Sequence, residues 1–154
     1  MRGRLLATLV ALALLGAGCT TAGPRNSAGQ VTRSAAADAF AVRVGDCTGP
    51  LSNGSVETLS LVPCDQAHAW EAYARTELTG SEYPGAGAIQ DQGDEFCSAE
   101  FRRFVGVPSN RSTYRTMYLQ PTRQTWEKAV DREIVCLVGL SSGGIKGSLR
   151  GVKK

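Results

Sequence analysis

Asp65, His68 and Glu71 lie three residues apart and are the side chains best suited to metal binding or acid–base catalysis. On a helix they would share one face and could hold a metal ion. In a turn that leads into a strand they would not converge, and His68 is the only histidine of the chain. We therefore expect structural roles: His68 and Asp65 fix the turn after Cys64 by hydrogen bonds, and Glu71 pairs with an arginine such as Arg132. No metal and no cofactor is expected.

A second pattern with catalytic potential is formed by Gly139, Ser141 and Gly143, which have the spacing of a hydrolase nucleophile elbow. In that arrangement a helix follows the serine, and the acid and the histidine of the triad come later in the chain. Here no helical pattern follows, and neither an acid nor a histidine lies downstream. We interpret the segment as a glycine-rich exit from a strand. A secreted hydrolase or metal-dependent enzyme that uses His68 is the chief functional alternative.

The N-terminal segment has the layout of a bacterial lipoprotein signal. Arg2 and Arg4 supply positive charge, residues 5–15 are almost wholly apolar, and small residues lead to Cys19. This apolar run is shorter than the roughly 20 residues of a transmembrane helix, so we expect cleavage before Cys19. Acyl chains on Cys19, palmitate among them, would hold the protein on the extracytoplasmic face of the cell membrane. Cleavage without lipidation is the alternative.

The remaining four cysteines form an even set outside the cytosol, where thiols oxidise, and predict two disulfides. No C-x-x-C pair occurs, so a structural zinc site has little support. Cys47 and Cys64 flank one loop between expected strands, whereas Cys97 lies on the apolar face of an expected helix and Cys136 within the last strand. We predict the pairs Cys47–Cys64 and Cys97–Cys136. Two other connectivities stay open from the sequence alone.

Apolar periodicity and turn residues predict a small α+β domain, in which a mostly antiparallel sheet carries one main helix. The helix begins after Pro84 and Gly85 and ends before Gly106. Its apolar face comprises Ile89, Phe96, Cys97, Phe101 and Phe104. The expected strands are residues 40–44, with Phe40, Val42 and Val44 on one face, and residues 56–62, 70–78, 113–119 and 134–140.

Composition divides the chain into a signal peptide at residues 1–18, a flexible tether at 19–37, a folded domain at 38–141 and a basic, glycine-rich tail at 142–154. Between residues 38 and 139 there are 14 acidic and nine basic residues, a net charge of −5, whereas the whole chain has +3. An acidic domain lacks the basic stripe that nucleic acids require, so no nucleic-acid partner is expected. The tail is expected to be solvated; contact with anionic lipid or cell-wall polymer is the alternative.

Six aromatic residues and one charged pair are candidates for binding. We expect most of the aromatic side chains in the core, with a ligand groove as the alternative, for Trp70, Tyr73, Tyr83, Tyr114, Tyr118 and Trp126. Asp131 and Arg132 precede the apolar run of the last strand. We predict that Arg132 is partly buried and bonded to a carboxylate, with Glu71 as the leading candidate.

Several short motifs occur in a fixed order along the chain. They are Val44-Gly45-Asp46-Cys47, Val62-Pro63-Cys64-Asp65 with His68 and Glu71 at set offsets, Tyr83-Pro84-Gly85, Cys97, Phe104-Val105-Gly106, Gln120-Pro121-Thr122, Trp126, and Asp131-Arg132 before Cys136. Together they resemble the actinobacterial septum-formation domain family over residues 42–138. Val130 departs from the resemblance, because glycine is expected before Asp131. The resemblance implies an envelope-located, non-enzymatic module with a link to division septa.

We therefore expect an extracytoplasmic lipoprotein module that recruits or senses proteins of the envelope or of the division septum. Because the domain is acidic, basic or neutral proteins are the expected partners. Beside the enzyme that uses His68, a purely structural spacer is a third alternative.

Overall fold

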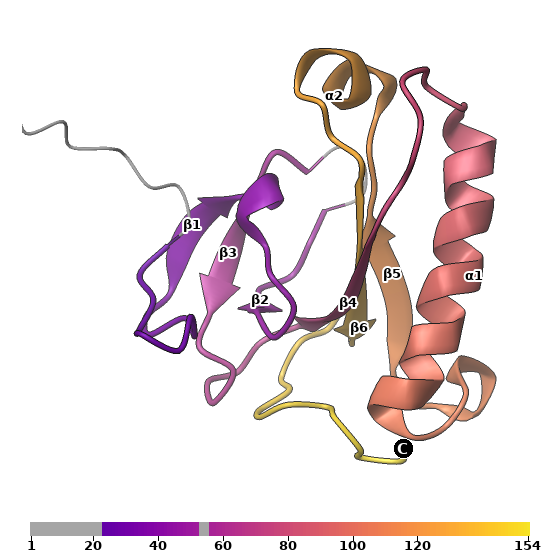
Figure 1. The fold of residues 1–154 in the computed structure, drawn as a ribbon. Coiled ribbons are helices and arrows are strands. Elements are labelled where there is room, and N and C mark those ends of the chain that lie inside the picture. The colour runs from indigo at the N-terminus through magenta and orange to yellow at the C-terminus, as the bar shows by residue number, and fades with distance from the viewer. Residues whose placement is uncertain (1–22, 53–55) are drawn as a thin grey trace, which may run out of the picture.

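A computed structural model describes residues 23–52 and 56–154 and shows a curled six-stranded sheet covered on one face by a long helix (Figure 1). All strand pairs are antiparallel, in the order β1-β3-β2-β4-β6-β5. The strands are β1 (Ala35–Asp38), β2 (Cys47–Thr48), β3 (Thr58–Val62), β4 (Trp70–Glu77), β5 (Arg115–Leu119) and β6 (Glu133–Gly139). The helices are α1 (Ala86–Val105) and α2 (Arg123–Lys128), with 3-10 turns η1 (Ala39–Ala41) and η2 (Ser109–Arg111). The predicted α+β class is confirmed.

Helix α1 has the predicted bounds for local reasons. Gly85 stands at its N-cap, and Gly106 ends it with φ of 93°, a left-handed conformation that glycine adopts without strain. The amide of Gly106 donates to the carbonyl oxygen of Arg102, 3.0 Å away. Arg102 and Arg103 lie in the last turn, where positive charge complements the helix dipole.

The sheet has an apolar core on each face. Along β6, Ile134, Cys136 and Val138 point towards α1, whereas Val135 and Leu137 point to the opposite face. This alternation follows from the pleat of a strand, in which successive side chains point to opposite faces. Because both faces of β6 are covered, its sequence is a continuous apolar run rather than an alternating one.

Both predicted disulfides are present. Cys47 in β2 is bonded to Cys64 in the turn after β3, and Cys97 in α1 is bonded to Cys136 in β6. The second bond joins α1 to the middle of β6 across a sequence separation of 39 residues. In the loop-entropy model such a cross-link stabilises the fold by roughly 4 kcal/mol.

The expected strand at residues 40–44 is wrong. The chain turns there because the carboxylate of Asp38 accepts a 2.9 Å hydrogen bond from the amide of Phe40 and caps η1. Phe40 is 56% exposed, and Val44 is 44% exposed. The strand at this edge is instead β1, which pairs with β3. The paired residues run from Ala35 opposite Leu61 to Asp38 opposite Thr58.

The segment expected to be a flexible tether is packed on the domain in its described part, residues 23–37. Arg25 forms an ion pair with Asp46, with a 2.6 Å distance between Nη1 and Oδ1, and both side chains are less than one-tenth exposed. The bond to Asp46 raises the pKa of Arg25. Residues 35–37 belong to β1, so the fold begins before Asp38. The predicted signal peptide and the predicted acylation at Cys19 lie outside the described residues.

The C-terminal tail is packed on the domain rather than loosely solvated. Ile145 is 7% and Leu149 is 3% exposed, and both belong to the core on the α1 face. The backbone of Ile145 pairs with that of His68 in an isolated bridge. Among the helices of residues 23–52 and 56–154, none combines the length and the apolar character needed to cross a membrane.

Candidate functional site

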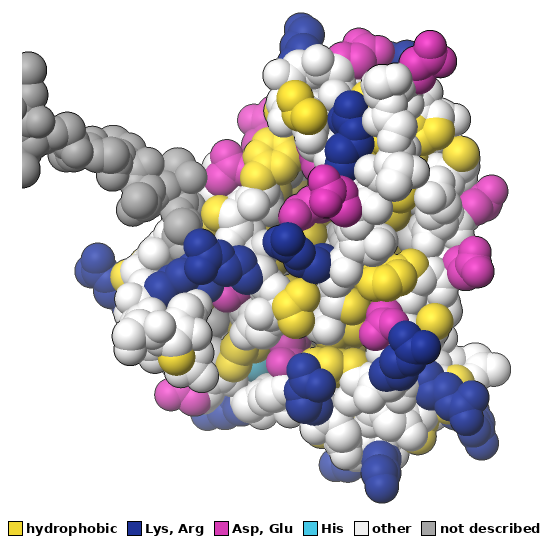
Figure 2. All heavy atoms as spheres, viewed as in Figure 1, with side chains coloured by type: hydrophobic (Ala, Val, Ile, Leu, Met, Phe, Trp, Pro, Cys, Tyr) yellow, Lys and Arg dark blue, Asp and Glu magenta, His cyan; other side chains and the backbone are white. Residues whose placement is uncertain are grey.

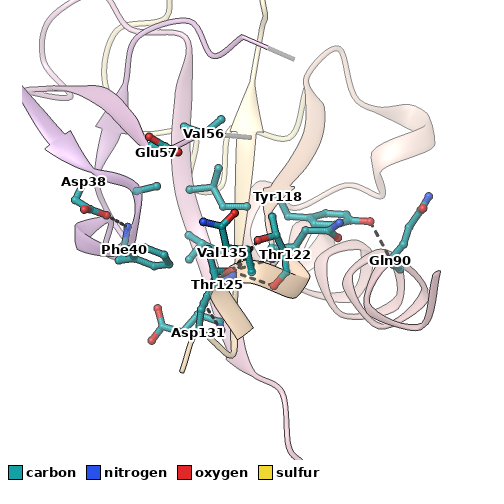
Figure 3. A pocket seen from close by; sticks show the side chains of 15 residues that line it. Asp38, Phe40, Val56, Glu57, Gln90, Tyr118, Thr122, Thr125, Asp131 and Val135 are labelled. Atoms are coloured by element: carbon teal, nitrogen blue, oxygen red, sulfur yellow. Dashed lines mark hydrogen bonds between the residues drawn. The ribbon is translucent and has the colours of Figure 1, made fainter. Parts of the chain in front are cut away.

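A groove of about 790 Å³ opens where the N-terminal edge of the sheet approaches the end of β5 and helix α2. Figure 3 shows Asp38 and Phe40 on one side of this groove and Tyr118 and Gln90 on the other. The residues that line it are Asp38, Ala39, Phe40, Val56, Glu57, Gln90, Tyr118, Leu119, Gln120, Thr122, Gln124, Thr125, Asp131, Glu133 and Val135. The groove is therefore built from segments that lie far apart in the sequence.

The charge of the groove lining is one-sided. Four of its residues are acidic, and none of these described lining residues is a lysine or arginine. Asp38 caps η1, and Glu133 forms a 3.1 Å ion pair with Arg75, which lies outside the lining. The carboxylate of Glu57 faces solvent. The lining thus presents negative charge to a ligand, only partly balanced by Arg75.

Apolar surface accompanies these carboxylates. Val135 is 4% exposed and forms part of the groove floor with the half-buried Leu119, whereas the Phe40 ring is 56% exposed. A large aromatic side chain left this open is available to cover a ligand or to enter an interface. Acidic side chains beside exposed apolar surface suit a cationic partner with apolar side chains.

Tyr118 fixes the α1 side of the groove. Its hydroxyl lies 3.2 Å from the carbonyl oxygen of Gln90 and 3.0 Å from Oδ1 of Asp94, so these two acceptors share its single proton. Burial, and then the bond to Asp94, raise the pKa of Tyr118 to about 12. The ring lies against Gly93, where a Cβ atom would meet ring carbon Cε2 at 2.8 Å. Glycine at this position therefore allows Tyr118 to pack directly on the helix.

Helix α2 and the turn after it form the wall that adjoins Tyr118 (Figure 3). Thr122 and Thr125 make a reciprocal capping box at the start of α2. The Thr125 hydroxyl also donates to Oδ2 of Asp131 at 2.9 Å, and the amide of Glu133 donates to Oδ1 of Asp131 at 3.2 Å. Asp131 therefore links α2 to the start of β6, so its predicted importance has a structural basis.

Behind this wall, Trp126 is the centre of an aromatic and cationic stack. The indole is 1% exposed and its Nε1 donates to the carbonyl oxygen of Ser81 at 3.0 Å. Tyr83 packs edge-on against it, with 5.9 Å between ring centres. The Arg132 guanidinium lies 3.6 Å from the Trp126 ring centre. This stack holds α2 against the loop before α1.

The predicted pairing of Arg132 with Glu71 is wrong. Arg132 donates to the carbonyl oxygens of Gly80, Trp126 and Asp131. Strand register explains the separation: Glu71 pairs with Val138 near the end of β6, whereas Arg132 precedes the start of β6. The two side chains therefore belong to opposite ends of the β4–β6 pair. The expectation that Arg132 is partly buried is confirmed.

Glu71 holds the C-terminal tail instead. Its carboxylate is buried, at 3% exposure, and accepts 2.7 Å hydrogen bonds from the hydroxyl of Ser148 and the amide of Leu149. Within the part of the chain that the structure describes, Glu71 makes no ion pair. The expected arginine partner is thus replaced by two neutral donors.

Asp65, His68 and Glu71 do not converge. Asp65 is exposed, whereas His68 is 2% exposed, and its Nδ1 lies 2.9 Å from the carbonyl oxygen of Gln66. Because a carbonyl can only accept, Nδ1 carries the proton of this bond. Within residues 23–52 and 56–154, no group of three or more potential ligands could hold a metal ion. The predicted hydrogen bond of His68 in the turn after Cys64 is present, whereas among the described residues the Asp65 side chain has no hydrogen-bond partner.

A smaller cleft of about 610 Å³ lies beside these residues. It is lined by Asp65, Glu71 and the Cys47–Cys64 disulfide, together with residues from both described ends of the chain. The hydrogen bonds of Glu71 and the packing of the tail account for its polar lining. We regard this cleft as the seam between the tail and the domain.

The family model for septum formation matches residues 44–150, and the chain belongs to this family. No curated protein and no solved structure matches the chain. Residues from the motifs that carry the resemblance, Gln120, Thr122 and Asp131, line the groove, and Trp126 and Arg132 support it. The groove is therefore the cavity that we assign as the candidate site.

Among the groove residues that the sequence does not indicate are Asp38, Phe40, Glu57 and Glu133. The alternation of Phe40 with Val42 predicts one face of a strand rather than a groove residue. The acidic residues gave no local signal, since carboxylates are common on any protein surface. Asp38, Glu57 and Glu133 become a candidate site only when the fold brings them to one groove with Phe40.

Proposed function

We propose that this protein is a lipid-anchored, extracytoplasmic and non-enzymatic module of the envelope or division septum. In this proposal it recruits or senses a protein partner through the groove between η1 and α2. Membership of the septum formation family supports the cellular context. The observation that carries the binding role is the groove itself, with four carboxylates, no lysine or arginine in its described lining and an exposed Phe40.

A protein partner fits this surface better than a wall polymer does. Anionic polymers carry the same sign of charge as Asp38, Glu57 and Glu133, and like charges brought together at an interface cost several kcal/mol. A basic or neutral protein segment experiences no such repulsion. Its apolar side chains would cover Phe40 and Val135, and its cations would approach the carboxylates.

The burial of His68 supports a binding role over catalysis. A general base must reach the proton that it abstracts, directly or through one water molecule. His68 is 2% exposed, and its backbone pairs with that of Ile145. Its Nδ1 is engaged with Gln66. These contacts suit a structural histidine.

The anchor is the second part of the proposal. The residues before Cys19 have the charge, the apolar length and the small residues of a lipoprotein signal. Acylation at Cys19 would confine the domain to the membrane surface, which raises its effective concentration towards other membrane-bound proteins.

Site-specific photo-crosslinking in living cells tests the binding role. A photoreactive amino acid at Gln124, in the groove lining, should capture a discrete partner, whereas the same amino acid at exposed Arg33, outside the lining, should not. Combining Phe40→Ala with Glu57→Gln should reduce the Gln124 cross-link by about tenfold or more, because an aromatic anchor and a charge are removed.

The matched control combines Val44→Ala with Glu82→Gln, which also removes one exposed apolar side chain and one charge but lies outside the groove. It should leave the cross-link unchanged. Both double variants should keep the melting temperature of the parent protein. Equal losses in the two variants would contradict the assignment of the partner to the groove.

A further inference from the structure

One end of the molecule carries a dense group of cations. This basic end comprises Arg102, Arg103, Arg111, Arg150, Lys153 and Lys154, all of them exposed. Figure 2 shows lysine and arginine side chains gathered around the end at which Figure 1 marks the C-terminus. The one ion pair found among these six described cations joins Arg103 to Glu100, one turn earlier in α1.

The fold holds the tail cations in fixed positions. The amide of Gly151 donates to the carbonyl oxygen of Phe104 at 2.7 Å, and the amide of Lys153 donates to that of Val105 at 2.9 Å. The Arg150 guanidinium lies 4.5 Å from the Phe104 ring centre. The tail is therefore an ordered part of the surface, contrary to the expectation of a solvated run.

Helix electrostatics account for only part of this charge. The C-terminal end of a helix carries about half a negative charge, which Arg102 and Arg103 in the last turn already complement. Arg111, Arg150, Lys153 and Lys154 add four further charges to the same end. Uncompensated cations at this density repel one another, so an anionic surface would stabilise them.

Part of the N-terminal segment lies across a cleft from Arg150, one residue of the basic end. Asn26, Gln30 and Val31 line the same cleft as Ser148 and Arg150. Residue 26 is only a few positions after Cys19, and an extended chain of that length spans at most about 25 Å. An anchor at Cys19 would thus lie within about 25 Å of residue 26, a reach that allows the side that carries Arg150 to face the membrane.

We propose that the basic end is a membrane-facing surface that binds the phosphate groups of anionic phospholipids. Clusters of four to eight lysine and arginine residues near a membrane bind anionic lipid headgroups in this way. The inference concerns a different surface from the groove and goes beyond the proposed function. With this end on the lipid, α2 and the groove wall at the other end of the molecule face away from the membrane (Figure 1).

Vesicle flotation with the full chain tests the inference. The test variant carries Lys153→Gln and Lys154→Gln, and the matched control carries Arg123→Gln and Lys128→Gln on α2, at the other end of the molecule. Both lose two charges and keep the N-terminal segment, so any binding by that segment contributes equally. With vesicles that contain phosphatidylglycerol, the tail variant should partition about 30-fold more weakly than the parent, since each cation near the surface contributes separately.

The α2 variant should bind as the parent does, and Lys153→Arg with Lys154→Arg should restore binding because charge is retained. Added salt should weaken binding of the parent protein. Thermal melting checks that all the variants are folded. Equal partitioning of the tail and α2 variants, or equal binding to phosphatidylcholine vesicles that lack anionic lipid, would overturn the inference. Retention by a wall polyanion without retention by the vesicles would overturn it as well.

Discussion

The guanidinium of Arg132 lies 3.6 Å from the centre of the Trp126 ring and donates to the carbonyl oxygen of the same residue at 2.9 Å. Arg132 therefore binds both the side chain and the backbone of one buried residue in α2. Through these contacts, and through the bond of Asp131 to Thr125, the segment before β6 fixes the wall of the groove. The contact explains why a charged side chain stands before an apolar strand.

Arg132→Ala should destabilise the domain by about 2 kcal/mol, because it removes the stack on Trp126 and hydrogen bonds to three carbonyls. Arg132→Lys should cost less than the alanine change but should not match arginine, since an ammonium lacks the planar group that stacks. Urea unfolding of both variants measures the difference. If the free energy of unfolding is unchanged in Arg132→Ala, the stack contributes nothing to stability.

Val130→Gly should stabilise the protein. Val130 has φ of 55°, a left-handed conformation that is strained for a β-branched residue, and its side chain is 74% exposed. Glycine relieves a strain of about 1–2 kcal/mol, offset in part by the greater freedom of the unfolded chain. We expect a net gain of about 0.5–1 kcal/mol, measured as a higher urea midpoint. The control Val44→Gly replaces an exposed valine without a positive φ and should destabilise.

The sequence predicted elements whose evidence is local. The 3.6-residue period of Ile89, Phe101 and Phe104 together with the glycine at 106 defines α1 without reference to the rest of the chain. The disulfide between Cys97 and Cys136 could be assigned because the helix face and the last strand were both recognised.

Other features depend on contacts that no short window of sequence contains. Strand β1 consists of three alanines and Asp38, a composition that is also typical of a linker, and only its pairing with β3 makes it a strand. Helix α2 has six residues and one buried side chain, Trp126, so it lacks a helical period. The partner of Glu71 depends on the register of β4 against β6, which alternation alone does not determine.

Glu71→Gln should loosen the C-terminal tail. In glutamine an NH2 group replaces one carboxylate oxygen: facing Leu149 it leaves the buried amide without an acceptor, and facing Ser148 it forces that hydroxyl to accept instead of donate. In either orientation the Leu149 amide loses its charged acceptor, which forms the stronger hydrogen bond. An unsatisfied buried donor costs about 1–3 kcal/mol. Hydrogen exchange of the Leu149 amide should accelerate in the variant. The control Ser148→Ala removes one bond and leaves the Leu149 amide bonded, so exchange as fast in the control as in Glu71→Gln would contradict the role of the carboxylate.

Cys19→Ser should release the protein from the membrane fraction or leave it unprocessed, because the proposed acylation point is removed. Fractionation of cells, followed by mass spectrometry of the N-terminus, measures both outcomes. Cys97→Ser combined with Cys136→Ser serves as the comparison, since it removes two other cysteines that are joined in a disulfide. A Cys19→Ser protein that stays membrane-bound with a normally cleaved N-terminus would show that lipidation is not the anchor.

Tyr73 should make stability depend on alkaline pH. Its hydroxyl donates to the carbonyl oxygen of Cys97 at 2.7 Å and lies 2.9 Å from Oγ1 of Thr116. Burial raises the pKa of Tyr73 to about 12 in the folded protein, against about 10 in the unfolded chain. The folded state therefore holds the proton more tightly. This contribution is complete below about pH 10 and is lost as the pH rises towards 12.

Tyr73→Phe should reduce the fall in unfolding free energy between about pH 10 and pH 12, while costing about 1 kcal/mol at neutral pH through the lost hydrogen bond. Part of the fall should persist in this variant, because Tyr118 also has a pKa raised to about 12. Urea unfolding at a series of pH values measures the slope. Tyr114→Phe is the control, since within residues 23–52 and 56–154 the Tyr114 hydroxyl has no hydrogen-bond partner. A slope that is the same in Tyr73→Phe as in the parent protein would show that ionisation of Tyr73 is not coupled to folding.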